Sequence, residues 1–137
     1  MSALVVPDEG EKRMLDCMVN GYGSTGWRLA LFQNNLTPGP STVFADLTLA
    51  TFSGYAEVTP AFGAATTVSD KGQTEDTFQR TFVCDGGGIG NTIYGYVVYD
   101  ALVNVILWAE RFDFSVVMTT NGNTIRVTTK LTAASEN

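Results

Sequence analysis

Acid–base chemistry in this 137-residue chain would fall to its carboxylates, because the chain contains no histidine. Histidine is the commonest general base, and without it serine and threonine hydroxyls lack their usual activating partner. Glu57, Glu110 and Asp113 are the carboxylates that a folded sheet could bring together. A glycosidase would need two of them held about 5–9.5 Å apart, and their spacing does not predict that arrangement. The sequence therefore predicts a protein that is not an enzyme and has no catalytic residues.

A glycine-rich stretch, residues 85–91 (DGGGIGN), has the composition of a phosphate-binding loop. Such loops lie between a strand and the N-terminus of a helix. Here strands are predicted on both sides, and a calcium loop would need more oxygen ligands than Asp85 and Asn91 supply. We therefore predict no cofactor and no metal ion. We interpret the stretch, including Gly87 and Gly88, as a flexible loop that could become ordered against a neighbouring subunit.

Three aromatic residues, Tyr94, Tyr96 and Trp108, form the remaining candidate site. Tyr94 and Tyr96 are two residues apart and are predicted to share one face of a strand. Aromatic faces stack well on sugar rings, so an exposed patch of the three would be a candidate glycan-binding platform. The alternative is packing in the core or in an interface between subunits, where tyrosine and tryptophan are frequent. This alternative is favoured, and burial of the three side chains would exclude the platform.

The composition predicts one globular domain over residues 1–137, with 45% hydrophobic and only 16% charged residues. A chain of this length can bury a core of its own. The net charge is −6 and no cluster of lysine or arginine occurs, which argues against binding to nucleic acid or to an anionic membrane. So low a charged fraction is typical of domains that keep part of their surface against a partner.

Cys17 and Cys84 lie far apart in the sequence, and we interpret them as reduced, buried side chains. A disulfide between them stays open as an alternative, whereas a zinc site would need more ligands. The start of the chain, MSALVVPDEG, lacks the basic and apolar regions of a signal peptide. No stretch approaches the roughly 18 apolar residues of a membrane span. These features predict a soluble protein folded in a reducing cytosol.

One short helix is predicted over residues 8–20, after an extended start at residues 1–7. Asp8 is the expected N-cap, and Gly21 is expected to end the helix in the left-handed conformation. Gly10 is expected to weaken the first turn by about 1 kcal/mol relative to alanine. Residues 1–7 could serve as an arm that docks on a neighbouring molecule.

The rest of the chain predicts strands, organised around residues 91–112. This stretch predicts two strands joined by a turn at Asp100 and Ala101. Alternation in the first strand predicts two opposite faces, formed by Ile93, Gly95, Val97 and Tyr99 and by Tyr94, Tyr96 and Val98. The second strand, residues 103–112, is an almost continuous apolar run. Such a run is typical of a strand that is covered on both faces and lies in the middle of a sheet or sandwich rather than at an edge.

Further strands are predicted at residues 27–32, 54–58, 66–69, 75–84, 112–118 and 124–131. The last two flank Asn121-Gly122, the strongest short signal for a β-hairpin. Together these are about seven or eight short strands with one N-terminal helix and no alternation of strands with helices. The predicted fold class is mainly β, as an antiparallel β-sandwich of the jelly-roll or a related Greek-key type.

Four segments of the chain carry a resemblance in the order and types of their residues. They are residues 5–21, 27–59, 90–112 and 121–132, and the second includes the step Phe52-Ser53-Gly54-Tyr55. Together they resemble small structural proteins of tailed bacteriophages that are encoded among the virion genes. The resemblance covers most of the chain and includes no catalytic signature, so it assigns no functional residue.

The resemblance implies a non-enzymatic virion component, and within that class a decoration or cement protein on the outside of the capsid shell. Its expected partners are the major capsid protein and neighbouring copies of itself in a homo-oligomer, assembled in the host cytoplasm. The acidic balance of the chain is compatible with the capsid exterior, away from packaged DNA. A tail, adaptor or fibre component that binds glycans through Tyr94, Tyr96 and Trp108 stays open as the alternative.

Overall fold

The computed structural model describes residues 4–21, 25–68 and 71–133. It is mainly β, with one α-helix and eight strands in that part of the chain, and the strands pair antiparallel. The predicted class is therefore confirmed. In chain order the elements are α1 (Asp8–Asn20), β1 (Trp27–Phe32), the short 3-10 helix η1 (Phe44–Asp46), β2 (Thr66–Val68), β3 (Lys71–Glu75), β4 (Arg80–Val83), β5 (Asn91–Asp100), β6 (Val105–Met118), β7 (Thr124–Val127) and β8 (Lys130–Ala133).

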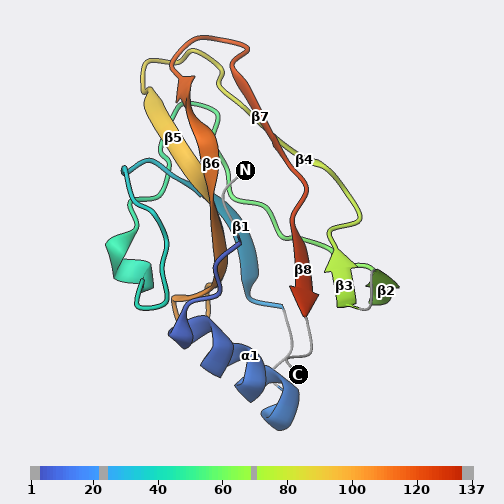
Figure 1. Ribbon diagram of the computed structural model, residues 1–137. Helices are drawn as coiled ribbons and strands as arrows, with labels where there is room; N and C mark the ends of the chain where they lie inside the picture. The colour runs from blue at the N-terminus through green and yellow to red at the C-terminus, as the bar shows by residue number, and fades with distance from the viewer. Residues whose placement is uncertain (1–3, 22–24, 69–70, 134–137) are drawn as a thin grey trace.

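The strands form three sheets, in the orders β1-β5-β6, β4-β7 and β2-β3-β8. Figure 1 shows the first sheet on one side of the molecule and the other two on the opposite side. β5 is the middle strand of the first sheet, whereas β6 lies at its side. The expectation that the second apolar strand occupies the middle of a sheet is therefore wrong. The outer edge of β6 is covered by the start of the chain instead, as described below.

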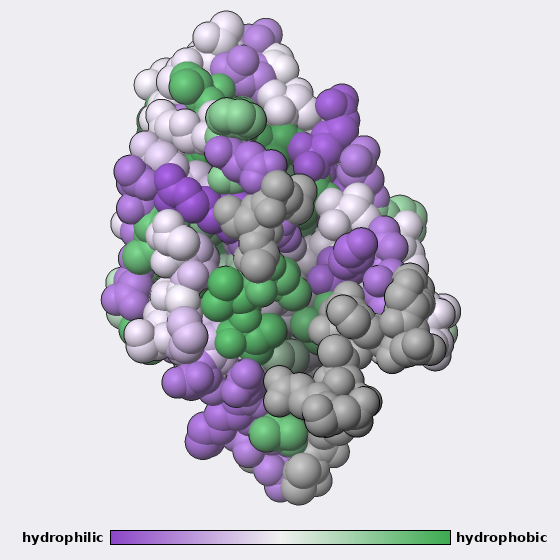
Figure 2. All heavy atoms as spheres, viewed as in Figure 1, coloured by the Kyte–Doolittle hydropathy of each residue, from purple (hydrophilic) through white to green (hydrophobic). Residues whose placement is uncertain are grey.

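The main core lies between the β1-β5-β6 sheet and the β4-β7 pair. Leu29, Val98 and Trp108 fill it from the first sheet, and Phe82 and Ile125 close it from the other side. A smaller cluster on the opposite face of the first sheet consists of Ala30, Val97, Tyr99, Ile106 and Ala109, covered by Phe44, Leu47 and Leu49. Both faces of this sheet are thus covered, which explains its apolar strands. Figure 2 shows further hydrophobic side chains gathered at the centre of the same view, just above α1.

A bulge in β6 decides which of its side chains enter the main core. Between the pairs that Val98 and Tyr99 make, β6 has one residue more than β5, and Leu107 is left without a paired residue. Leu107 and Trp108 are consecutive, yet both belong to the main core. A bulge of this kind turns two neighbouring side chains to the same face. The bulge therefore explains why Leu107 and Trp108 share a face, whereas the cover on both faces of the sheet explains why the run is apolar throughout.

A second shift lies further along the same pair of strands, where residues 112–115 of β6 are opposite the single residue Tyr94. β6 continues through this shift, so the two strands predicted on either side of residue 112 are one strand. The shift also changes the face of Ile93. That residue packs in the main core with Tyr96 and Val98, whereas strict alternation predicted the opposite face.

The turn at Asn121-Gly122 does not join a hairpin, because β6 pairs with β5 and β7 pairs with β4. It carries the chain from one layer to the other instead (Figure 1). The Asn123 side chain accepts hydrogen bonds from the N–H groups of Thr119 (3.2 Å) and Thr120 (2.8 Å). These bonds satisfy backbone groups that strand pairing would otherwise use. The predicted hairpin is therefore wrong, although the turn is present.

Three of the shorter predicted strands differ from the structure. The strand expected at residues 54–58 is reduced to one bridge between Val58 and Leu29. The strands expected at residues 75–84 and 124–131 are interrupted, between β3 and β4 and between β7 and β8. β2 confirms the strand expected near residues 66–69, whose last position lies outside the described residues.

The N-terminal segment, defined as residues 4–21, begins at the outer edge of β6 beside Ala109 and continues into α1, which lies below the ends of the strands in Figure 1. Val5 N donates to Ala109 O (2.8 Å), and Ala109 N donates to Val5 O (2.9 Å). α1 then spans the predicted residues and ends at Gly21, whose φ is 70°, but its N-cap is Pro7 and not Asp8. The described part of the expected arm thus folds back on its own chain, and residues 1–3 of that arm lie outside the described residues.

Gly10 meets the edge of β6 so closely that a side chain has no room. A Cβ at Gly10 would lie 2.5 Å from the Leu107 carbonyl oxygen, and the Ile106 oxygen is close as well. Gly10→Ala is therefore expected to lower the free energy of unfolding by about 1–3 kcal/mol, although alanine is the better helix former. Urea unfolding followed by circular dichroism measures this change.

Gly72→Ala is the matched control for that experiment, because nothing lies within 4 Å of its Cβ position. Its stability is expected to equal or slightly exceed that of the wild type, since alanine has less backbone freedom to lose on folding. A Gly10→Ala protein as stable as the wild type would contradict the close packing of α1 on β6.

Candidate functional site

The structure places two of the three candidate aromatic side chains inside the core. Trp108 is 0% exposed and Tyr96 is 5% exposed. Tyr94 is half-buried, and the guanidinium carbon of Arg111 lies over its ring, 5.2 Å from the ring centre. The three side chains therefore form no common exposed patch. Their arrangement favours the core interpretation over a glycan-binding platform.

A chain of hydrogen bonds connects the two buried aromatic residues. Trp108 Nε1 donates to Thr129 Oγ1 over 2.8 Å, and Thr129 Oγ1 donates to the Tyr96 hydroxyl over 3.3 Å. Tyr96 in turn donates to Glu110 Oε1 over 3.0 Å. All four residues are buried. These hydrogen bonds connect β5 and β6 to Thr129, between β7 and β8, and so hold the two layers together. They also satisfy buried polar groups that would otherwise lack a hydrogen-bond partner.

The carboxylates that the sequence singled out have separate places in the structure. Glu57 accepts the hydroxyl of Tyr99, with 2.7 Å to Oε2, and Glu110 accepts the hydroxyl of Tyr96. Asp113 lies exposed on β6. Among the residues that the structure describes, no three acidic or cysteine side chains gather as a metal site would require. The buried Glu110 and the half-buried Glu57 therefore serve as hydrogen-bond acceptors for tyrosines of the core.

Burial raises the pKa of three tyrosine hydroxyls. It raises the pKa of Tyr55 to about 12, and burial together with the carboxylates Glu110 and Glu57 raises the pKa of Tyr96 and Tyr99 well above the usual value. In the unfolded chain the same hydroxyls have a pKa near 10.0, the ordinary value for tyrosine. A group whose pKa is higher in the folded state stabilises the fold fully at pH values below its unfolded-state pKa. This stabilisation is lost as the pH rises from the unfolded-state pKa through the folded-state pKa.

The free energy of unfolding is therefore expected to fall as the pH rises beyond about 10, through the window between the unfolded and folded pKa values. Urea titrations at increasing pH measure this slope, and the ultraviolet absorbance of tyrosinate reports ionisation directly. Tyr99→Phe should reduce the slope, because it removes one of the shifted groups. Ionisation of all tyrosines near pH 10 in the folded protein would contradict the burial of these hydroxyls.

The glycine-rich loop is held by its own chain. Ser53 N donates to Ile89 O (2.9 Å), and Ile89 N donates to Ser53 Oγ (3.1 Å). The N–H of Gly87 points at Asp85 Oδ1 (2.9 Å), so a carboxylate occupies the place that a phosphate would take. A Cβ at Gly87 would lie 3.1 Å from Ser53 Oγ, and Gly88 has a φ of 115°. Contacts within the chain therefore hold this exposed loop, and its ordering against a neighbouring subunit stays a prediction.

Asp76 and Arg80 form a two-pronged ion pair at the break between β3 and β4, with distances of 2.7 and 2.9 Å. Asp76 Oδ1 also accepts the N–H groups of Ala61 and Phe78. Burial by itself would raise the pKa of Asp76, but Arg80 and the two N–H groups outweigh burial and lower it. The carboxylate adjoins a groove of about 370 Å³. Because its oxygens are already occupied, it fixes the loop and offers little to a ligand.

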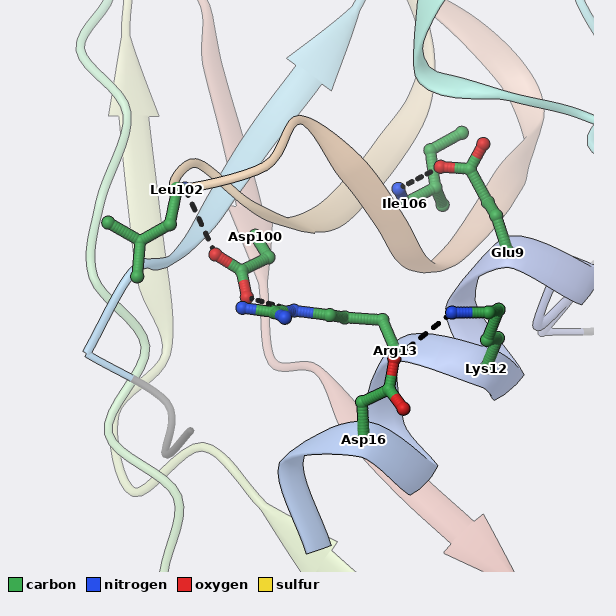
Figure 3. Close-up of polar contacts among 7 residues, drawn as sticks. All are labelled: Glu9, Lys12, Arg13, Asp16, Asp100, Leu102 and Ile106. Atoms are coloured by element: carbon green, nitrogen blue, oxygen red, sulfur yellow. Dashed lines mark hydrogen bonds and ion pairs between the residues drawn. The ribbon is translucent and has the colours of Figure 1, made fainter. Parts of the chain in front are cut away.

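A second groove, of about 240 Å³, lies between α1 and the turn that joins β5 to β6. Figure 3 shows its charged side chains engaged in contacts, which are Lys12 Nζ to Asp16 Oδ2 (3.2 Å), Arg13 Nε to Asp100 Oδ2 (2.9 Å) and Ile106 N to Glu9 Oε2 (2.8 Å). The contacts of Arg13 and Glu9 attach α1 to the sheet, whereas the Lys12–Asp16 pair lies within the helix. The sequence did not indicate them, because Arg13 and Asp100 are 87 positions apart.

Large apolar side chains remain exposed on the described surface, namely Leu15, Val43, Phe78, Val83, Ile89, Leu102, Val103, Phe114 and Val117. Phe114 is exposed to 84% and lies in the part of β6 that bulges opposite Tyr94. Alternation along the strand gave no indication of this exposure. Exposed aromatic side chains on a packed domain are candidates for contact with a partner.

Cys17 and Cys84 form no disulfide in the described part of the chain. Cys84 is buried as expected, whereas Cys17 is half-buried. No helix in the described part of the chain is long and apolar enough to cross a membrane. The sequence matches no known protein-family model and no curated protein.

Proposed function

We propose that this chain is a non-enzymatic structural protein of a tailed-phage virion, and that it decorates the outside of the capsid shell. The resemblance of its four segments to such proteins supports the proposal. The net charge of −6 is compatible with a place away from packaged DNA. The partners would be the major capsid protein and neighbouring copies of this chain. The protein would stabilise the shell through repeated contacts.

The observation that carries the proposal is apolar surface left outside a closed core. Phe114 is 84% exposed and Leu102 is 68% exposed, although the core of the domain is filled. Burying such a side chain against a partner contributes about 1.5–3 kcal/mol. Phe114 lies in the bulge of β6 and Leu102 in the turn between β5 and β6, and paired residues of β5 and β6 flank both positions. These flanking pairs restrict the backbone at both positions. Rigid presentation of apolar side chains reduces the entropy lost on binding.

The proposal extends to the finer topology of the fold, an antiparallel β-sandwich of the jelly-roll or Greek-key type. Two layers with a shared apolar core support it, as does the passage of the chain from one layer to the other between β6 and β7. Sandwiches of this kind expose loops and strand edges to neighbours without a ligand site.

The copy number per virion tests the proposed function. Quantitative mass spectrometry of purified particles compares this chain with the major capsid protein. Copies comparable to those of the major capsid protein are expected for a decoration protein. A small copy number would move the chain to the tail or neck, and absence from particles would reject a virion role.

A further inference from the structure

The outer edge of β6 is a strand-docking edge, and the N-terminal segment occupies it. Val5 and Ala109 exchange two backbone hydrogen bonds, and the Glu9 carboxylate accepts the N–H of Ile106 over 2.8 Å. Unpaired strand edges bind other strands readily, so an edge of this kind must be covered. These bonds satisfy both backbone groups of Ala109 and the N–H of Ile106, and they set the register of the segment on β6.

Side chains of α1 add specificity to this docking (Figure 3). Arg13 pairs with Asp100, whose side chain is only 1% exposed. Asp100 Oδ1 also accepts the N–H of Leu102 over 3.0 Å, which fixes the carboxylate at the end of β5. Gly10 lets the helix approach the edge of β6 without a side chain in between. The segment and the edge are therefore complementary in backbone pairing, charge and shape.

The segment joins the rest of the chain through residues 21–26, whose sequence GYGSTG is rich in glycine. Any second copy of the chain presents the same edge, the same Asp100 and the same Ile106 N–H. An element that exchanges between identical chains makes the same contacts in both forms, so exchange costs little free energy. A high local concentration of copies, as in an assembled lattice, favours the exchanged form.

We propose that the N-terminal segment is an exchangeable arm, which docks on the β6 edge of a second copy through these same contacts. This inference rests on the self-association that forms part of the proposed function. It keeps the expected role of the N-terminus as an arm and names its partner, a second copy, and its docking site, the edge of β6 near Ala109.

Disulfide trapping in the full-length chain tests the exchange. The native thiols are removed by Cys17→Ala and Cys84→Ala, and Val5→Cys and Ala109→Cys are introduced on separate chains. Paired residues of this kind lie about 5.5 Å apart at Cα, within the range of a disulfide. The two proteins are unfolded together, refolded and mildly oxidised. A chain with Thr81→Cys in place of Ala109→Cys measures random collision, because Thr81 is exposed on β4.

Exchange is expected to give at least about tenfold more covalent dimer than the collision control, because docking raises the effective concentration of the two thiols. Two results together would overturn the proposed exchange. The yield of covalent dimer would equal that of the control, and the double variant Val5→Cys/Ala109→Cys would form its disulfide within one chain. Light scattering on the wild type shows whether the chain self-associates at all, and so distinguishes failure of the exchange from failure of self-association. An oligomer with internal disulfides alone rejects exchange and keeps self-association, whereas a monomer at every concentration rejects both.

Discussion

Trp108→Ala is expected to lower the free energy of unfolding by about 3–5 kcal/mol, since a fully buried tryptophan leaves a large cavity. The indole is 0% exposed, and its ring lies 5.9 Å from that of Trp27 and 5.5 Å from that of Phe62. The substitution also removes the donor to Thr129, which then leaves a buried hydroxyl with one partner fewer. Urea unfolding followed by tyrosine fluorescence and circular dichroism measures the loss.

Phe114→Ala is the matched control, because it truncates an aromatic side chain of the same strand that is 84% exposed. Its effect on the free energy of unfolding is expected to stay within about 0.5 kcal/mol. Trp108→Phe helps to separate the two causes, since it removes the N–H donor but leaves a much smaller cavity than Trp108→Ala does. Equal stability of the Trp108→Ala and Phe114→Ala proteins would contradict the burial of Trp108 between the layers. The stable Phe114→Ala protein can then be tested for loss of capsid attachment.

Asp100→Ala is expected to lower the free energy of unfolding by about 3 kcal/mol, as is usual when one partner of a buried ion pair is removed. Asp100 is 1% exposed and pairs with Arg13, whose side chain is 13% exposed. The substitution also takes away the acceptor for the N–H of Leu102. Because Arg13 belongs to α1, the helix should loosen together with the loss of stability. Limited proteolysis of the N-terminal segment and urea unfolding measure the two effects.

Asp16→Ala is the control for this experiment, because it removes the other ion pair of the same helix. The Lys12–Asp16 pair is on the surface, with Lys12 81% exposed. Solvent and salt screen such pairs, so the expected change is within about 0.5 kcal/mol. If Asp16→Ala and Asp100→Ala had similar effects, the attachment of α1 through Asp100 would be refuted.

The candidate site includes residues whose burial the sequence pattern did not predict. Trp108 and Phe114 lie on the same strand, yet one is in the core and the other is on the surface. Their spacing carries no sign of the difference, because the two register shifts depend on how β6 fits against β5. Tyr96 could not be separated from Tyr94 for the same reason. The composition allowed a platform of exposed aromatic side chains, but the burial of Tyr96 and Trp108 argues against one.

Local chemistry was sufficient for other features. The helix at residues 8–20, its end at Gly21 and the turn near Asp100 all follow from short-range rules. Capping, left-handed glycine and chain reversal involve residues close in sequence, so the sequence states them directly. Alternation along strands predicted the mainly β class correctly, since a half-buried sheet imposes that period wherever it occurs.

Pairing between distant segments was decided by the tertiary structure. Asn121-Gly122 makes a turn in any context, but the partner of the following strand depends on which edge is free, and β7 pairs with β4. Arg13 finds Asp100, and Val5 finds Ala109, only when the whole domain brings them together. Contacts between residues so far apart in the sequence produce no periodic pattern of residue types along it. The sequence alone therefore determined the local elements and the class of fold. Strand partners, bulges and buried polar contacts depend on the packing of the complete chain, so only the tertiary structure decided them.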